Sequence, residues 1–199
     1  MGNFWGHLKT VAKHRRLVMQ GCFRIGLIAQ GLTHDLSKFS PTEFWTCVRY
    51  YQGNRSPNVK EREVRGYSLA WMHHKGRNKH HFEYWTDIRP GSKTYAPIPM
   101  PNRYLAEMVM DRIAACKTYQ GRDYTDASPL QYFEKARESS AIHPQTRRKL
   151  QFLLGMLARQ GEQQTFQFIR QVVLKDLPFA EEDGDTQEEK LAEENSIRS

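Results

Sequence analysis

The chain has few cysteines and no long apolar segment. Its three cysteines, Cys22, Cys47 and Cys116, form no CxxC pair, and their odd number argues against a disulfide framework. No segment approaches the roughly 20 consecutive apolar residues of a membrane-spanning helix, and charged residues interrupt positions 1–16, where a signal peptide would be apolar. We therefore expect a soluble, cytoplasmic protein in a reducing setting, with no membrane partner.

Strand signals are also scarce, so helices are expected to form the fold. No stretch alternates apolar and polar residues as a half-buried strand does, and the prolines within residues 90–101 indicate an extended loop. Ser-Pro pairs, which place a capping serine before proline at the first helical position, indicate helix starts at Ser40, Ser56 and Ser128. The predicted class is an all-α helical bundle. Apolar residues at helical spacing predict helices over residues 4–30, 57–75, 102–120, 128–138, 144–159 and 161–176.

Charge is distributed unevenly along the chain. Residues 181–199 hold eight acidic and two basic side chains, a net charge of −6. The whole chain has a net charge of +8, so residues 1–180 carry a net charge of +14. With 39% hydrophobic residues in a length of 199, the chain suits one domain. We expect a helical metal-binding domain over residues 1–180 and an acidic, disordered tail over residues 181–199. The basic body favours anionic partners, although ordinary solvated helix faces give the same composition.

Histidines and aspartates follow one another in an order that indicates a metal site. Imidazole is the commonest metal ligand in proteins, and ligands that are distant in sequence are gathered by the fold. An adjacent His-Asp pair lies between an upstream histidine and a downstream aspartate, and the stretch HHKGRNKHH adds two histidine pairs. The predicted ligands are His14, His34, Asp35, His73, His74, His80, His81 and Asp111.

The ligand within each histidine pair and the number of ions stay open. Neighbours on a helix differ by about 100° around its axis, so only one of His73 and His74 faces the site if the helix continues through both. His80 and His81 are joint candidates. A His-Asp pair such as His34-Asp35 can supply an imidazole to one ion and a carboxylate to two, so one or two divalent ions are expected. Imidazole suits Mn, Fe, Co, Ni and Zn, and Mg is a further candidate.

These motifs resemble the HD superfamily of metal-dependent phosphohydrolases. The metal site of that superfamily joins a histidine, a His-Asp pair and a distal aspartate on a helical bundle, as His14, His34-Asp35 and Asp111 would here. The stretch HDLSK resembles the HDxxK form, in which the lysine, here Lys38, lies near the phosphate. The histidines at 73–81 look like the extra ligands of the two-metal branches. The GYP tripeptide of the cyclic-dinucleotide phosphodiesterases is missing, and HHFEYW stands at that place.

A second resemblance covers the chain up to about residue 177. The stretches HDLSKFSPTEF, HHKGRNKHHFEYW and PMPNRYLAEMVMDRIAACKTYQG, with a later IHP, are similar to an uncharacterised bacterial and phage family that carries HD-like motifs. This resemblance implies the fold and the metal site, and it brings no particular activity.

The HD resemblance implies hydrolysis of a phosphate ester in a phosphorylated small molecule or a nucleotide. Asp35 would bridge the metal ions, and Lys38 would hold the phosphate as a point charge. Glu83, which closely follows His81, is the candidate proton carrier. The candidate substrate-binding residues are the basic residues beside the predicted ligands: Lys38, Arg77, Lys79 and Arg112.

Two other functions stay open. Some enzymes of the HD fold hold two irons in a similar ligand order and use oxygen to cleave C–C or C–P bonds, so an HD-type diiron oxygenase is the alternative. The basic charge of residues 1–180, with aromatic residues interleaved as in RYYQGNR, gives a non-catalytic nucleic-acid-binding protein as the second alternative. Ligand spacing does not separate the two enzymes.

Overall fold

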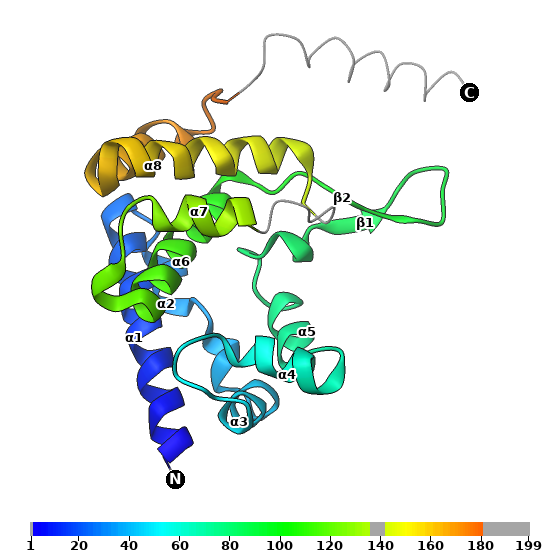
Figure 1. Ribbon diagram of the computed structural model, residues 1–199. Helices are drawn as coiled ribbons and strands as arrows, with labels where there is room; N and C mark the ends of the chain where they lie inside the picture. Colours follow the sequence, from blue (N-terminus) through cyan, green and yellow to red (C-terminus); the bar gives the residue numbers. More distant parts are fainter. Residues whose placement is uncertain (1, 136–141, 181–199) are drawn as a thin grey trace.

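The computed structural model of the chain describes residues 2–135 and 142–180, and helices dominate them (Figure 1), which confirms the all-α class. The expected tail, residues 181–199, lies outside the described residues. Within them, no helix combines the length and the apolar character needed to cross a membrane. The helices are α1 (Gly2–Ile25), α2 (Ile28–Thr33), α3 (Pro41–Arg49), α4 (Pro57–Arg65), α5 (Leu69–Lys75), α6 (Asn102–Gln120), α7 (Ser128–Lys135) and α8 (Pro144–Gln171), with 3-10 turns η1 (Leu36–Phe39), η2 (Phe82–Tyr84), η3 (Gly121–Asp123) and η4 (Val173–Lys175).

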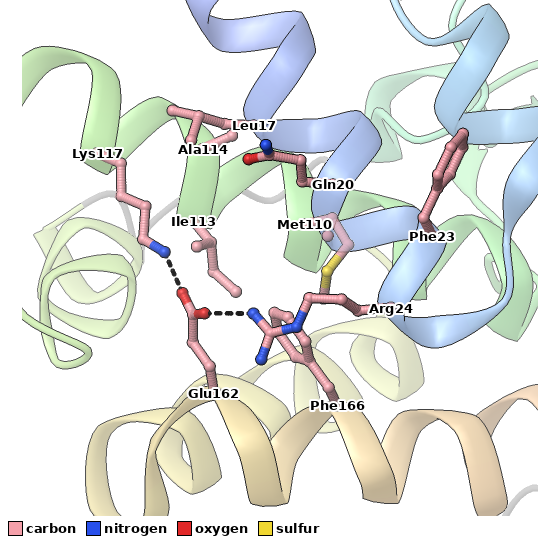
Figure 2. Close-up of a pocket in the computed structure, with 11 residues that line it drawn as sticks. Leu17, Gln20, Phe23, Arg24, Met110, Ile113, Ala114, Lys117, Glu162 and Phe166 are labelled. Carbon is pink, nitrogen blue, oxygen red and sulfur yellow. Dashed lines mark hydrogen bonds and ion pairs between the residues drawn. The ribbon is translucent and has the colours of Figure 1, made fainter.

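Helix α6 occupies the centre of the bundle. It lies between α1 and α8, and its apolar side chains, from Leu105 to Ala114, are buried around most of its circumference. The bounds of α6 are those expected from the sequence. Figure 2 shows the place where the three helices meet, around a cavity of about 380 Å³. There Glu162 of α8 pairs with Lys117 of α6 and with Arg24 of α1, at 2.7 Å in the latter case.

A sharp reversal separates α1 from α2. One helix was expected over residues 4–30, and that expectation is wrong, because Gly26 has a φ of 90° and ends α1. The chain then folds back, and Gly31 of α2 packs against α1 so closely that an added Cβ would lie 2.9 Å from the Cβ of Cys22. This hairpin returns the chain toward the middle of α1, where His14 lies.

The helix expected over residues 57–75 is also divided. Gly66, with a φ of 80°, ends α4, and α5 starts after Ser68, whose hydroxyl accepts from the backbone N–H of Trp71 at 3.0 Å. The buried carboxylate of Glu61 in α4 accepts from the hydroxyl of Ser68 and from the backbone N–H of Leu69. These bonds fix the start of α5 and with it the direction of the histidines at its end.

A small hairpin replaces part of the expected loop over residues 90–101. Strand β1 (Thr86–Ile88) pairs antiparallel with β2 (Tyr95–Pro97), and Asp87 lies opposite Ala96. All three residues of β1 are exposed, while β2 is exposed at Tyr95 and half-buried at Ala96 and Pro97, so neither strand carries an alternating apolar pattern over more than three residues. Further on, Gly161 has φ 77° and ψ 176° inside α8, which marks the expected division between two helical segments, although α8 ends at Gln171 and not at 176.

The buried imidazole of His7 makes stability depend on pH. His7 is 4% exposed and lies 5.3 Å from the ring of Phe44 and 5.8 Å from that of Tyr51, measured between centroids. Burial, with a smaller effect of the charge of Lys38, lowers the pKa of His7 from 6.5 to about 4. The unfolded chain therefore takes up a proton at His7 below pH 6.5, while the folded chain stays neutral there until about pH 4.

We predict that this difference lowers the free energy of unfolding by up to about 3 kcal/mol as the pH falls from 6.5 to 4. His7→Phe should remove that part of the pH dependence, because its ring does not titrate. Chemical denaturation at a series of pH values measures both proteins, and their difference isolates His7 from the carboxylates that titrate nearby. Parallel stability curves for the two proteins would contradict the prediction.

Candidate metal centre

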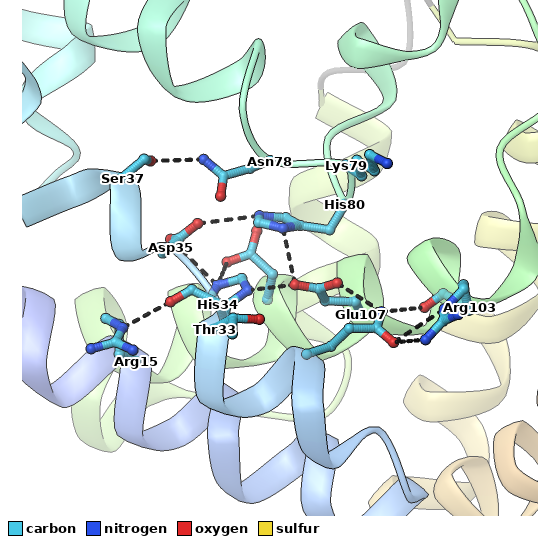
Figure 3. Close-up of polar contacts among 12 residues, drawn as sticks. Arg15, Thr33, His34, Asp35, Ser37, Asn78, Lys79, His80, Arg103 and Glu107 are labelled. Atoms are coloured by element: carbon cyan, nitrogen blue, oxygen red, sulfur yellow. Dashed lines mark hydrogen bonds and ion pairs between the residues drawn. The ribbon is translucent and has the colours of Figure 1, made fainter. Parts of the chain in front are cut away.

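The segment between α2 and η1 presents the His-Asp pair to the interior. Asp35 has φ 54° and ψ 27°, a left-handed conformation that non-glycine residues adopt rarely and that often marks functional sites. Arg15 of α1 holds the segment by donating to the backbone oxygens of His34, at 2.8 Å, and of Leu32, at 3.0 Å. Figure 3 shows His34 and Asp35 pointing into the space between α1, α6 and the loop after α5.

The carboxylate of Asp35 lies between two sets of imidazoles. Its Oδ2 is 3.6 Å from Nε2 of His14 and 3.3 Å from Nε2 of His34. Its Oδ1 is 3.3 Å from Nε2 of His74 and 3.4 Å from Nε2 of His80. Each oxygen therefore faces a different set of ring nitrogens, and the side chain of Asp35 is 1% exposed.

Two groups of potential ligands share Asp35, and within each group the ligand atoms lie within 4.8 Å of one another. Asp111 completes the first group, with Oδ1 3.0 Å from Nε2 of His14, and His81 completes the second. We call these groups the first subsite and the second subsite. The first subsite is His14, His34, Asp35 and Asp111, and the second is Asp35, His74, His80 and His81.

Two glutamates, which the sequence analysis missed as site residues, hold the outer nitrogens of the rings. Glu107 Oε1 lies 2.9 Å from Nδ1 of His34 and 3.2 Å from Nδ1 of His80 (Figure 3). Glu43 Oε2 lies 2.9 Å from Nδ1 of His74. Carboxylates that accept from the far nitrogen of a metal-binding histidine fix its tautomer and orientation. The spacing of Glu107, four residues before Asp111 on one helix face, was the available sequence signal.

Charges inside the centre compensate one another. Burial alone would lower the pKa of His34, but the charge of Asp35 and the contacts with Asp111 and Glu107 raise it well above its usual value. Burial opposes the ionisation of Asp35, yet the charges of His34 and Lys38 hold its pKa well below the usual range. Burial lowers the pKa of His81, which is therefore neutral and carries a lone pair at neutral pH.

Unused ring nitrogens face the interior of the centre. Within the part of the chain that the structure describes, Nε2 of His34, His80 and His81 is buried and makes no hydrogen bond. Leaving a buried polar atom unpaired is costly, so such atoms call for a partner. Imidazole nitrogens and carboxylate oxygens form the donor set that divalent transition metals prefer. The buried His and Asp groups are thus positioned to hold a metal ion.

Lys38 is the predicted phosphate-binding residue that contacts this centre. Its Nζ lies 2.6 Å from Asp35 Oδ2, and its side chain is 28% exposed. Arg77 is exposed and donates to the backbone oxygen of His73 at 3.3 Å. Lys79 lies 5.8 Å above the ring of Tyr104, and Arg112 lies over an aromatic ring of the neighbouring helix α7. Arg77 and Lys79 thus contact groups outside the two subsites, whereas the charge of Arg112 also interacts with that of Asp111 in the first subsite.

His73 and Glu83 occupy different positions from the ligands. Nδ1 of His73 lies 2.6 Å from Glu43 Oε1, and His73 belongs to neither subsite. Its neighbour His74 does, which separates the two members of that pair, whereas both His80 and His81 enter the second subsite. Glu83 lies on η2, and burial raises the pKa of its carboxyl group.

Comparison with known proteins identifies a family. Residues 3–156 match DUF5662, described as a family of unknown function, and the chain belongs to that family. The match covers both subsites and the two outer glutamates. Searches of curated proteins and of solved structures give no match.

The neighbouring histidines of α5 provide a matched test of the second subsite. We predict that His74→Ala lowers the bound metal, because an imidazole facing Asp35 is lost, while His73→Ala leaves the metal content unchanged. Elemental analysis of both purified variants, with the metal expressed per chain, measures the difference. Equal metal loss in the two variants would contradict the assignment of His74 and point to a general disturbance of α5.

Proposed function

We propose that the protein is a metal-dependent phosphohydrolase with a two-ion centre, acting on a nucleotide or another phosphate ester. The observation that carries the proposal is the position of Asp35, whose two carboxylate oxygens face different sets of imidazoles. A carboxylate in that position suits a bridge between two cations, as two-metal hydrolases use. The resemblance of the HDLSK stretch to the HD phosphohydrolases supports the same assignment.

The donor set fits divalent ions such as Mn, Fe, Co, Ni or Zn. Each subsite offers imidazole nitrogens and a share of Asp35, and Asp111 adds a second carboxylate to the first subsite. When bound, such ions would lower the pKa of a water molecule and neutralise charge that develops on a phosphate. Imidazoles outnumber carboxylates in the two groups taken together, which favours transition metals over Mg.

Residues at and beside the centre are assigned to substrate access, phosphate binding and proton transfer. Asp111 lies on the partly exposed side of the centre, since its side chain is 16% exposed, while the side chains of His14 and His34 are 8% and 0% exposed. The side chain of Lys38 is also partly exposed, and we assign its ammonium group, paired with Asp35 at 2.6 Å, to a phosphate that approaches from solvent. Glu83, whose carboxyl pKa is raised by burial, is the candidate proton carrier. The net charge of +14 on residues 1–180 favours an anionic substrate.

The proposal is tested by loading the protein with each candidate metal and screening phosphate monoesters and diesters. Wild-type protein should hydrolyse at least one class of ester in a metal-dependent way, and Asp35→Asn should lose both activity and metal. His73→Ala serves as the control, because His73 lies beside the centre and belongs to neither subsite. Hydrolysis that is equal with and without Asp35 would contradict the proposal.

We further predict that Lys38→Met lowers the rate of phosphate-ester hydrolysis on the order of 10- to 100-fold, because the variant loses one charge-assisted hydrogen bond to the phosphate. The metal content should be kept, because an ammonium group cannot ligate a cation. Steady-state kinetics and elemental analysis of the same preparation measure the two effects. Loss of metal in Lys38→Met, with turnover per bound ion unchanged, would show that Lys38 supports the centre and does not bind phosphate.

A diiron oxygenase is the second candidate function. The specific observation in its favour is the number of imidazoles, since the two subsites together hold five histidines and two aspartates. Imidazole-rich sets suit iron as well as the hydrolytic metals. Anaerobic loading with iron, followed by electron paramagnetic resonance, separates the two: a mixed-valent diiron signal with oxygen uptake favours the oxygenase, and metal-dependent ester hydrolysis without oxygen favours the hydrolase.

A further inference from the structure

We infer that Glu107 is a positioning residue that couples the two subsites, so that both ions depend on one outer carboxylate. This inference rests on the two-ion centre of the proposed function. Glu107 is 5% exposed and lies on α6, behind the rings of His34 and His80 as seen from Asp35. Figure 3 shows its carboxylate beside both rings and joined to each by a dashed line.

One oxygen of Glu107 serves a ligand of each subsite. Oε1 lies 2.9 Å from Nδ1 of His34, which belongs to the first subsite, and 3.2 Å from Nδ1 of His80, which belongs to the second. The two rings lie close together, with centroids 4.4 Å apart and planes at 35°. Any movement of this oxygen therefore displaces both rings.

The shared oxygen also sets the tautomer of both histidines. An ionised carboxylate accepts hydrogen bonds and has no proton to donate, so both Nδ1 atoms must carry hydrogen. In a neutral ring, the lone pair is then on Nε2. Those Nε2 atoms face Asp35, at 3.3 Å for His34 and 3.4 Å for His80. Glu107 thus prepares one ligand atom for each ion.

The other oxygen of Glu107 is fixed by a chain of polar contacts. Oε2 accepts from Nε2 of Gln30 at 2.9 Å, and Oε1 of Gln30 accepts from Nη2 of Arg103 at 3.0 Å. The amide of Gln30 is oriented by Arg103, so its N–H groups must face the carboxylate. An amide in place of Glu107 would set one N–H group against another donor, either at Gln30 or at the histidines.

Glu43 provides the matched comparison. Its Oε2 lies 2.9 Å from Nδ1 of His74, in the second subsite, while its Oε1 faces His73, which belongs to neither subsite. Glu43 and Glu107 are both buried glutamates that hold ring nitrogens from outside. They differ in the number of subsites that they support, because Glu43 contacts a ligand of the second subsite alone and Glu107 contacts a ligand of each subsite.

The test is a titration of metal-free wild type, Glu107→Gln and Glu43→Gln with Mn²⁺, followed by calorimetry and by elemental analysis after equilibrium dialysis. Loss of an outer carboxylate typically weakens metal binding about 10- to 100-fold. We expect Glu107→Gln to weaken both binding steps by such a factor, and Glu43→Gln to weaken one step and leave the other within about two-fold of wild type.

Gln30→Ala keeps the Glu107 carboxylate and removes the hydrogen bond that supports it. It should therefore weaken both binding steps to a similar extent, and each by less than Glu107→Gln does. This second variant tests the inference even if Glu107→Gln fails to fold. If both Glu107→Gln and Gln30→Ala weakened only one binding step, the coupling would be overturned. Complete loss of one ion in Glu107→Gln, with the affinity for the other ion unchanged, would also overturn it and would show that Glu107 is a ligand of the lost ion. Failure of wild type to bind two ions would instead overturn the proposed two-ion centre.

Discussion

The burial of the Asp35 carboxylate is the constraint on which the rest of the centre depends. A buried carboxylate is tolerated only when cations or hydrogen-bond donors compensate its charge. Here the compensation comes from Lys38 at 2.6 Å and from imidazoles on both sides. These groups lie on different elements of the fold, so the hairpin of α1 and α2, the start of α5 and the packing of α6 against α1 must all be formed before the charge of Asp35 is compensated. The formation of the centre therefore depends on the formation of the whole fold.

The sequence predicted the inner residues better than the outer ones. His14, His34-Asp35 and Asp111 have an order and helical setting that indicate a metal site, and the structure brings them together. Glu107 was not predicted as a site residue, because a glutamate within a helix usually faces solvent. Only the tertiary structure shows that it is buried. Glu43 stands three residues after the capping Ser40, the position of the glutamate in a capping box. Its backbone N–H does donate to the Ser40 hydroxyl, at 3.4 Å, but its carboxylate turns to the histidines of α5.

The bundle class and the bounds of α6 followed from periodicity, because a long helix carries its signal over several turns. Two helix breaks did not. Gly26 and Gly66 both adopt positive φ, a conformation that glycine tolerates at little cost, yet glycine inside a periodic pattern is also compatible with a continuous helix. The choice is made by tertiary contacts, such as the packing of Gly31 against Cys22, which a single sequence does not display. The β1–β2 hairpin was missed for a related reason, since its exposed strands carry little apolar pattern.

The proposed centre has Asp35 as the bridge between two metal ions. It is tested most directly by a crystal structure of the metal-loaded protein, with anomalous scattering recorded above and below the absorption edge of the metal. We expect two anomalous peaks about 3.5–4 Å apart, one beside Oδ2 of Asp35 among His14, His34 and Asp111 and the other beside Oδ1 among His74, His80 and His81. A fully loaded crystal with a single peak, or with peaks away from Asp35, would contradict it.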